Sequence, residues 1–188
     1  LNKLFKGGFS TGHGHLREPQ DIMSYSALAA IAIQSNQNDQ HGGQSIPAFD
    51  YYMAPGVLKT FKRQYKQAIY ELLDYSDFIS FVNMDKKLTS INVNTNMFAP
   101  IYKDSVEVKR IFDKAYETAY KKTDRATYQA MEAFVHNLNT MHSRAGAQVP
   151  FSSINFGTDT SPEGRMVMKN YLLSIDAGLG KNETPIFP

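Results

Sequence analysis

Residues 143–160 constrain the fold more than any other stretch, because they combine a loop, an apolar strand and a helix start in that order. Residues 143–148 are small, polar or basic, and Gly146 is free to adopt a positive φ, so a loop is predicted here. The apolar residues of 149–156 do not alternate strictly, which predicts a strand covered on both faces. Residues 158–162 then supply capping oxygens for a helix from Glu163 onward. This order is typical of α/β proteins, which bind ligands at one end of a sheet.

Apolar residues at helical spacing predict long amphipathic helices over much of the remaining chain. The expected ranges are 22–34, 57–74, 105–121 and 124–142, and Gly178 and Gly180 terminate the last helix, which starts at Glu163. Pro55 and Gly56 are expected to mark the start of the 57–74 helix. Thr123 is expected to cap the 124–142 helix, which would pack against 105–121 as an antiparallel pair. Residues 78–100 are predicted to be rich in loops.

The composition excludes several kinds of protein and of site. A chain of 188 residues with 42% hydrophobic residues is globular in composition and long enough for one domain. A formal net charge of +2 is too small to indicate a nucleic-acid or membrane surface. The chain has no cysteine, which excludes thiolate nucleophiles, disulfides, thiolate zinc sites and iron–sulfur ligation. Neither a membrane span nor a signal peptide is visible, so a cytoplasmic protein is expected.

The histidines lack the spacing of a metal site. His13 and His15 flank a glycine without a third ligand, and the better interpretation of residues 11–15 is a loop. His136 and His142 are six residues apart, which does not place them on one helical face. We therefore predict no metal site, and no residue of the chain is predicted to be a catalytic acid, base or nucleophile.

Two polar features each allow two interpretations. Four cations with no acid between them occur within two turns of the 57–74 helix: Lys59, Lys62, Arg63 and Lys66. They form either a solvated face or a site that binds a polyphosphate. The polar run 35–45 is either a solvated loop or a segment in which Gly42 and Gly43 bring backbone amides close to a phosphate or a base.

Four segments fall in the order, and at about the spacing, of one enzyme family. They are residues 9–19 (FSTGHGHLREP), 37–50 (QNDQHGGQSIPAFD), 143–160 and 178–188. Over nearly its whole length the chain resembles the anaerobic (class III) ribonucleoside-triphosphate reductases, which are glycyl-radical enzymes. The resemblance implies an effector-nucleotide site near Arg17, Gln34, Lys59, Lys62, Arg63 and Lys66. It also implies two specificity loops, formed by His41, Gly42, Gly43, Gln44 and Ser45 and by Ser143, Arg144, Gly146 and Gln148.

The resemblance further implies a fold and an activity. The fold would be α/β, a ten-stranded barrel, and residues 1–188 would be a partial catalytic domain from the first half-barrel of a larger subunit. The enzyme would reduce ribonucleoside triphosphates to deoxyribonucleoside triphosphates for DNA synthesis, as a homodimer under allosteric control by ATP or a deoxynucleotide. An iron–sulfur activating enzyme would install the glycyl radical, and formate or a thiol protein would be the reductant.

The radical-bearing cysteines and glycine of the family would lie outside this chain, which would supply effector binding and substrate control. Three alternatives remain open: a nucleotide-binding regulatory module without catalysis, a pyruvate formate-lyase-like glycyl-radical enzyme, and a helical interaction domain. The His-Gly-Gly-Gln and Ser-Arg-Ala-Gly stretches favour the reductases, because pyruvate formate-lyases would not be expected to share them.

Overall fold

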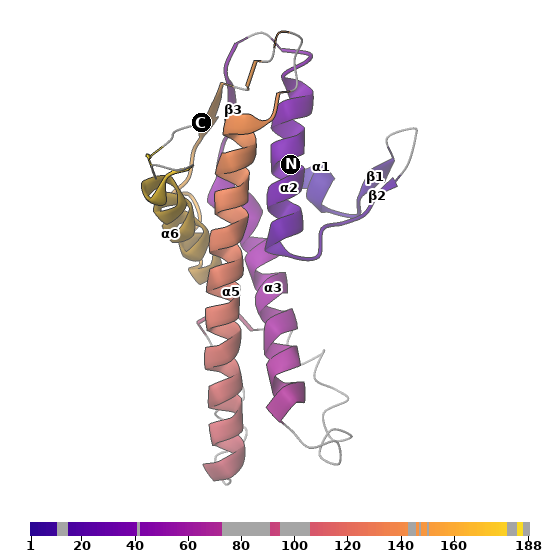
Figure 1. The fold of residues 1–188 in the computed structure, drawn as a ribbon. Coiled ribbons are helices and arrows are strands. Elements are labelled where there is room, and N and C mark those ends of the chain that lie inside the picture. The colour runs from indigo at the N-terminus through magenta and orange to yellow at the C-terminus, as the bar shows by residue number, and fades with distance from the viewer. Residues whose placement is uncertain are drawn as a thin grey trace.

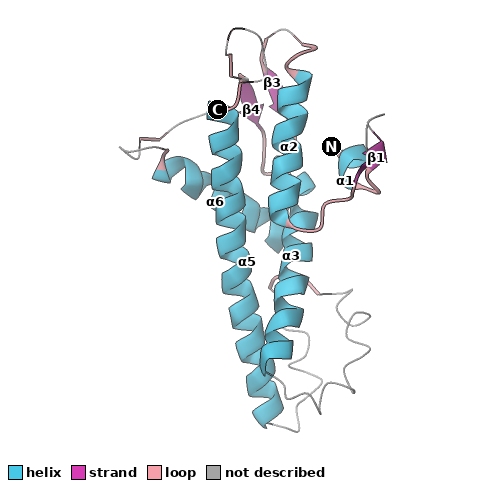
Figure 2. Ribbon diagram, turned by 45° about the vertical axis from the view of Figure 1, so that its right-hand side comes forward, coloured by secondary structure: helices cyan, strands magenta, loops and turns pink. Residues whose placement is uncertain are grey.

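The computed structural model is mixed α/β and mostly helical (Figures 1 and 2). It describes residues 1–10, 15–40, 42–72, 91–94, 106–142, 146, 148–149, 151–179 and 184–185. The helices are α1 (Asn2–Phe5), α2 (Ile22–Asn36), α3 (Phe49–Leu72), α5 (Val106–Thr140) and α6 (Pro162–Ala177). The strands are β1 (Phe9–Ser10), β2 (His15–Leu16), β3 (Gln44–Ile46) and β4 (Ser152–Ile154).

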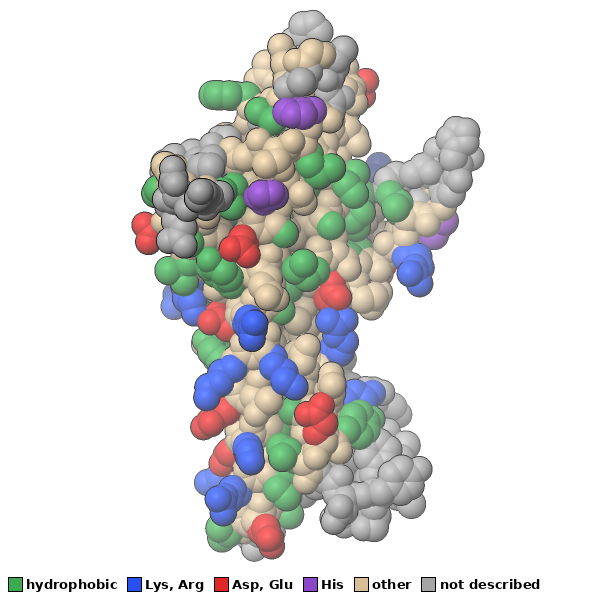
Figure 3. All heavy atoms as spheres, viewed as in Figure 1, with side chains coloured by type: hydrophobic (Ala, Val, Ile, Leu, Met, Phe, Trp, Pro, Cys, Tyr) green, Lys and Arg blue, Asp and Glu red, His purple; other side chains and the backbone are tan. Residues whose placement is uncertain are grey.

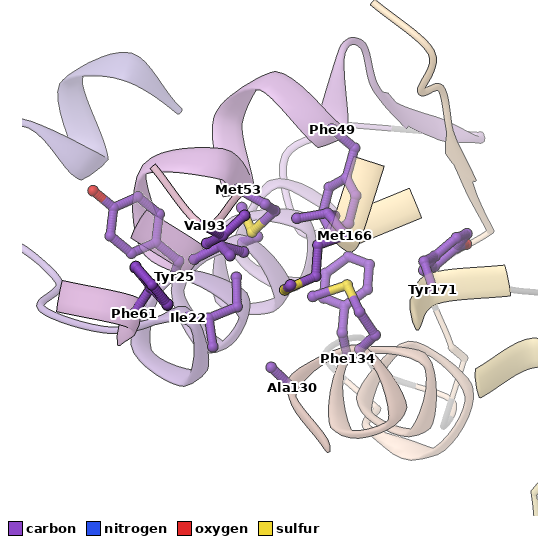
Figure 4. Packing of buried hydrophobic residues seen from close by; sticks show 14 of the residues in the cluster. Ile22, Tyr25, Phe49, Met53, Phe61, Val93, Ala130, Phe134, Met166 and Tyr171 are labelled. Atoms are coloured by element: carbon purple, nitrogen blue, oxygen red, sulfur yellow. The ribbon is translucent and has the colours of Figure 1, made fainter. Parts of the chain in front are cut away.

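The core lies where α2, α3 and α6 pack against the long helix α5. Helices α3 and α5 run side by side, with α2 and α6 alongside them in the upper half of Figure 1. Phe49 of α3 packs against both α5 and α6, with its ring centroid 4.9 Å from that of Phe134 on α5 and 5.8 Å from that of Tyr171 on α6 (Figure 4). Burial of such large apolar side chains is the main stabilising contribution to the assembly.

Two hydrogen bonds and a glycine hold α2 close to its neighbours. The Ser26 hydroxyl donates to the Ala130 carbonyl of α5 at 2.8 Å, and the Ile22 amide donates to the Thr60 hydroxyl of α3 at 2.9 Å. At Gly56 of α3, a Cβ atom would lie 2.8 Å from Cγ of Tyr25, which is closer than van der Waals contact allows. The lack of a side chain at Gly56 therefore permits the close crossing of α2 and α3.

The start of α6 confirms the predicted capping residues, and α2 begins at the predicted residue. Asp21 is the N-cap of α2 and accepts a hydrogen bond from the Ser24 amide at 2.8 Å. Ser161 caps α6 in the same way, with Pro162 in the first turn, and Gly178 follows the last helical residue. Residues 91–94, inside the span predicted to be rich in loops, contain no helix or strand; the rest of 78–100 lies outside the described residues.

The predicted break at Thr123 is wrong, because α5 is one helix of 35 residues. Thr123 is completely buried within it, and no antiparallel pair forms from residues 105–121 and 124–142. Neither glycine nor proline interrupts the sequence there, and the apolar stripe continues past the threonine, so helix continuation costs little.

The predicted start of α3 is also wrong, because the helix begins at Phe49 and includes Pro55 and Gly56. An internal proline costs about 3 kcal/mol. Burial of Phe49 and Met53, at 1% and 0% exposure, offsets that cost, because each such side chain contributes roughly 1.5–3 kcal/mol.

The sheet that contains β4 is small. Strands β3 and β4 pair in parallel, with Gln44 opposite Ser152 and Ile46 opposite Ile154. The predicted strand 149–156 is therefore too long, and its coverage on both faces is wrong, since Phe151 is 81% exposed. Among the described residues β4 pairs with β3 alone, so its other edge has no strand beside it there. The described strands form two two-stranded sheets, and they do not test whether a ten-stranded barrel forms.

Candidate functional site

Strands β3 and β4 lie side by side, and each follows one of the two predicted specificity loops. Because the strands are parallel, the segments that precede them meet at the amino end of the sheet. The Gln44 amide donates to the Phe151 carbonyl at 2.8 Å, which fixes residues 42–44 beside the segment that enters β4. Gly42 and Gly146 have φ of 93° and 91°, and a Cβ atom at either position would meet open space. Both loops therefore contain a backbone position that glycine adopts more readily than other residues.

The remaining members of the two loops differ in exposure. Gln44 is buried, whereas Ser45 and Gln148 are exposed. The Ser45 hydroxyl accepts a hydrogen bond from the Asn155 side chain at 3.3 Å, which links the two parallel strands through side chains. His41, Ser143 and Arg144 lie outside the described residues, and their predicted roles stay predictions.

The last turn of α2 contacts both loops through carboxamide side chains. Asn36 Nδ2 donates to Gln44 Oε1 at 3.0 Å, and Gln37 Nε2 donates to the Gln148 carbonyl at 3.5 Å. Gln34, a predicted effector residue, is 8% exposed and donates from Nε2 to the Asn137 carbonyl of α5 at 3.4 Å. This turn therefore lies between the end of α5 and the two loops.

Two buried polar atoms at the sheet have no hydrogen-bond partner in the described part of the chain. They are Gln44 Nε2 and Ser152 Oγ, which belong to directly opposed residues of β3 and β4. Gln44 also lines a pocket of about 470 Å³, together with Asn36, Gly43 and Ser45. A buried donor without a partner costs about 1–3 kcal/mol, and a hydrogen-bond acceptor that reached Nε2 would remove this cost.

The cations of α3 are partly neutralised by acids from the segment before α2. Lys59 Nζ pairs with Glu18 Oε1 and donates to the Pro19 carbonyl, while Arg63 pairs with Asp21 at 3.0 Å. The hydrogen bond from Lys59 is the main cause of a lowered pKa at Glu18. At Asp21 partial burial raises the pKa, but hydrogen bonds from Ser24 and Arg63 outweigh it, and the pKa is lowered overall.

The six predicted effector residues do not all lie together. Arg17 is exposed before α2, near the Lys59 and Arg63 ion pairs, whereas Gln34 lies at the opposite end of α2. Ile22 and Gln34 are about 18 Å apart along the helix axis. Lys66 lies 6.0 Å from the Tyr70 ring centroid, and burial lowers the pKa of Lys62 although the Glu163 carboxylate opposes this. Figure 3 shows cations interspersed with acids over α3 and α5.

A buried carboxylate that the sequence analysis did not single out fixes the opposite, carboxyl end of the sheet. Asp50 is fully buried, and its Oδ2 accepts hydrogen bonds from the amides of Gly157 and Asp159 at 2.8 and 2.9 Å. Its position in the first turn of α3 is a recognisable capping signal, but its partners are more than a hundred residues away. Only the tertiary structure identifies them.

The described residues contain neither a metal-binding cluster nor a membrane-spanning helix. No three histidine, aspartate or glutamate side chains in this part of the chain are arranged to hold a metal ion. None of the helices in the same ranges has the length and apolar character needed to cross a membrane.

Comparison with known proteins gives the family. The family model described as anaerobic ribonucleoside-triphosphate reductase matches residues 1–188. The chain is 25% identical over 189 residues to the anaerobic ribonucleoside-triphosphate reductases of Enterobacteria phage T4, Salmonella typhimurium and Escherichia coli. These alignments cover 100% of this chain but 25% of the phage protein and 21% of each bacterial one, so the chain spans about a quarter of its relatives' length. The match over the whole chain shows that it belongs to the anaerobic ribonucleoside-triphosphate reductase family.

Proposed function

We propose that the chain is part of the catalytic subunit of an enzyme that reduces ribonucleoside triphosphates, and that it binds an effector nucleotide and controls substrate choice. The observation that carries this proposal is at the amino end of the β3–β4 sheet, where the Gln44 amide donates to Phe151 and the Gln148 carbonyl accepts a hydrogen bond from Gln37. Glycines at positive φ, an unpartnered amide just below the surface and a neighbouring pocket are features suited to a nucleotide site.

The chemistry of the reduction is not assigned to residues of this chain. A glycyl radical with partner cysteines is what the family resemblance implies, but the 188 residues include no cysteine. The chain's own contribution is therefore nucleotide binding and positioning. The radical-activating enzyme and the reductant, formate or a thiol protein, would act on the rest of the subunit.

The effector site is proposed at the amino end of α2, with its anionic part on Arg63 and Arg17. Arg63 is exposed, with 53% of its side chain accessible, and a triphosphate can replace Asp21 as its partner. Lys59 is already paired with Glu18. We therefore expect it to attract the triphosphate by its charge and not to contact it directly. Lys62 and Lys66, which lie on α3 like Arg63, are further members of the proposed set. Gln34, at the opposite end of α2, is the last member.

A second copy of the subunit is the proposed partner of α2. Met23, Ala27 and Ile31 lie four residues apart on the exposed face of this helix, and Met23 and Ile31 are 45% and 50% exposed. Such a stripe on an otherwise packed helix is suited to a helix–helix interface. The effector site would then lie beside the interface between the two subunits.

The test measures nucleotide affinity of the full-length protein by calorimetry, with ATP and each deoxynucleoside triphosphate in turn. Arg63→Ala removes a charge-assisted contact of about 1.5–3 kcal/mol and should weaken binding roughly ten- to a hundredfold. Asp21→Asn keeps a good N-cap but releases Arg63, and should tighten binding by up to about fivefold, because an exposed ion pair is worth at most about 1 kcal/mol.

Lys169→Ala is the matched control, since Lys169 is also ion-paired and its side chain is 51% exposed, but it lies on α6. Its affinity should stay within about twofold of wild type. If Arg63→Ala binds every nucleotide as tightly as the wild-type protein, the cations of α3 are only a solvated face.

A further inference from the structure

The last turn of α2 joins three segments that are distant in sequence. Its carboxamides donate to the end of α5 through Gln34, to β3 through Asn36, and to the segment before β4 through Gln37. Gln34 and Gln37 are 8% and 4% exposed, so their side chains are confined by neighbours. Asn36 makes a second bond, to Gln40 Oε1 at 3.0 Å, which fixes the position of its amide group.

The other end of the same helix is tied to the cations of α3. Asp21 caps α2 and pairs with Arg63, and the next amide, that of Ile22, donates to Thr60. A nucleotide that takes Arg63 from Asp21 therefore changes the contacts that position the start of α2. Because a helix of 15 residues moves nearly as a rigid body of about 22 Å, a displacement at one end also moves the other.

We propose that α2 transmits the occupancy of the Arg63 end to the two loops, and that Asn36 and Gln37 are the positioning residues through which it acts. This inference rests on the proposed function. Asn36 sets the position of Gln44 in β3, and Gln37 sets that of Gln148 before β4. A single displacement of the last turn of α2 thus moves Gln44 and Gln148 together, and it couples the Arg63 end of the helix to both segments.

The hydrogen bond of Asn36 also decides which atom of Gln44 is available to a ligand. Asn36 donates to Oε1, and the buried Nε2 is left without a partner beside the pocket of about 470 Å³. A small displacement of the Gln44 side chain would expose this donor, which suits a carbonyl or ring-nitrogen acceptor of a nucleobase. Movement of Asn36 releases Oε1, and Gln44 can then present an acceptor instead.

The experiment measures substrate preference in the full-length protein, with CTP and GTP in competition, in the absence and presence of ATP, dATP, dGTP or dTTP. Asn36→Ala and Gln37→Ala should each reduce the effector-dependent change in preference roughly 2- to 30-fold. Effector affinity should stay within about threefold, because neither residue lies at the Arg63 end. Asn139→Ala is the control: Asn139 is a half-buried carboxamide whose Nδ2 donates to Val135 within α5 at 2.8 Å, and its loss should leave coupling unchanged.

Asn36→Asp provides a second test that does not depend on removing a side chain. Aspartate cannot donate to Oε1, so Gln44 should turn and donate from Nε2, which leaves an acceptor for the ligand. The preference between CTP and GTP should then change even without effector. Hydrogen exchange should show that effector binding no longer alters residues 42–46 in Asn36→Ala, or residues 148–149 in Gln37→Ala.

The outcomes separate the two proposals. If wild type responds to an effector and the three variants retain its preferences with and without that effector, the role of α2 is refuted and the proposed function stands. If no nucleotide binds to wild type or changes its preference, the proposed function fails and this inference fails with it.

Discussion

Replacement of Asp50 tests whether a buried carboxylate holds the end of β4. Asp50→Ala removes hydrogen bonds to the amides of Gly157 and Asp159, which are 2.8 and 2.9 Å long. Hydrogen bonds to a charged group contribute about 1.5–3 kcal/mol each. Asp50 Oδ1 is buried without a partner among the described residues, which offsets about 1–3 kcal/mol of that gain. We therefore expect a net loss of about 2–4 kcal/mol of unfolding free energy.

Urea unfolding of the 188-residue chain, followed by circular dichroism, measures this loss. With a slope of about 2 kcal/mol/M, the midpoint should fall by about 1–2 M while the slope itself stays constant. Asp39→Ala is the control, because Asp39 is an exposed aspartate after α2 and its replacement should change stability by less than about 0.5 kcal/mol. If Asp50→Ala unfolds at the same urea concentration as Asp39→Ala, the carboxylate does not hold the strand end.

Three further predictions concern the ion pair, the helix crossing and the chemistry. The pKa of Asp21 is lowered in the folded chain, so its stabilising contribution is present above the ordinary aspartate pKa of about 4 and is lost as the pH falls through the folded value; the stability difference between wild type and Asp21→Asn should shrink on acidification, and a constant difference would contradict the pairing. Gly56→Ala should destabilise by about 1–3 kcal/mol in thermal unfolding, because its Cβ would lie 2.8 Å from Tyr25; an unchanged melting temperature would show that the helices separate at little cost. The isolated chain should not convert CTP to dCTP, since it has no cysteine, and any turnover would show that radical chemistry is not confined to the rest of the protein.

Local signals in the sequence predicted the helices whose ends depend on nearby residues. Asp21 with Ser24, and Ser161 with Pro162, are capping combinations that act within one turn, so the starts of α2 and α6 were predictable. The same reasoning failed at Thr123, because a threonine acts as an N-cap only where the residues before it are not helical. Burial of Ala119, Thr123 and Thr127 against the core keeps α5 continuous there.

The acids that neutralise the cations of α3 could not be predicted from the sequence of that helix alone. No acid lies between Lys59 and Lys66 in the sequence, and this absence suggested an unneutralised site. The acids come from the segment before α2, about forty residues earlier, through the packing of α2 on α3. Since the sign and number of charges at a site depend on every element packed there, the effector proposal now rests on the exposed Arg63 more than on four cations together.

Nothing in the sequence indicated which groups Asn36 and Gln37, at the end of α2, would contact. Asparagine and glutamine carry no charge and follow no fixed spacing, and the polar run 35–45 was interpreted either as a solvated loop or as a phosphate-binding one. Gln37 and Gln44 are instead buried, and burial of a polar side chain is favourable only where hydrogen bonds compensate for lost water. Those bonds exist because β3 pairs in parallel with β4, which brings Gln37 to Gln148 across 111 residues of sequence. A parallel pairing of three residues on each side is weak alone, so the carboxamides of α2 and the sheet depend on one another for their geometry. A substitution in either should therefore change the structure of both.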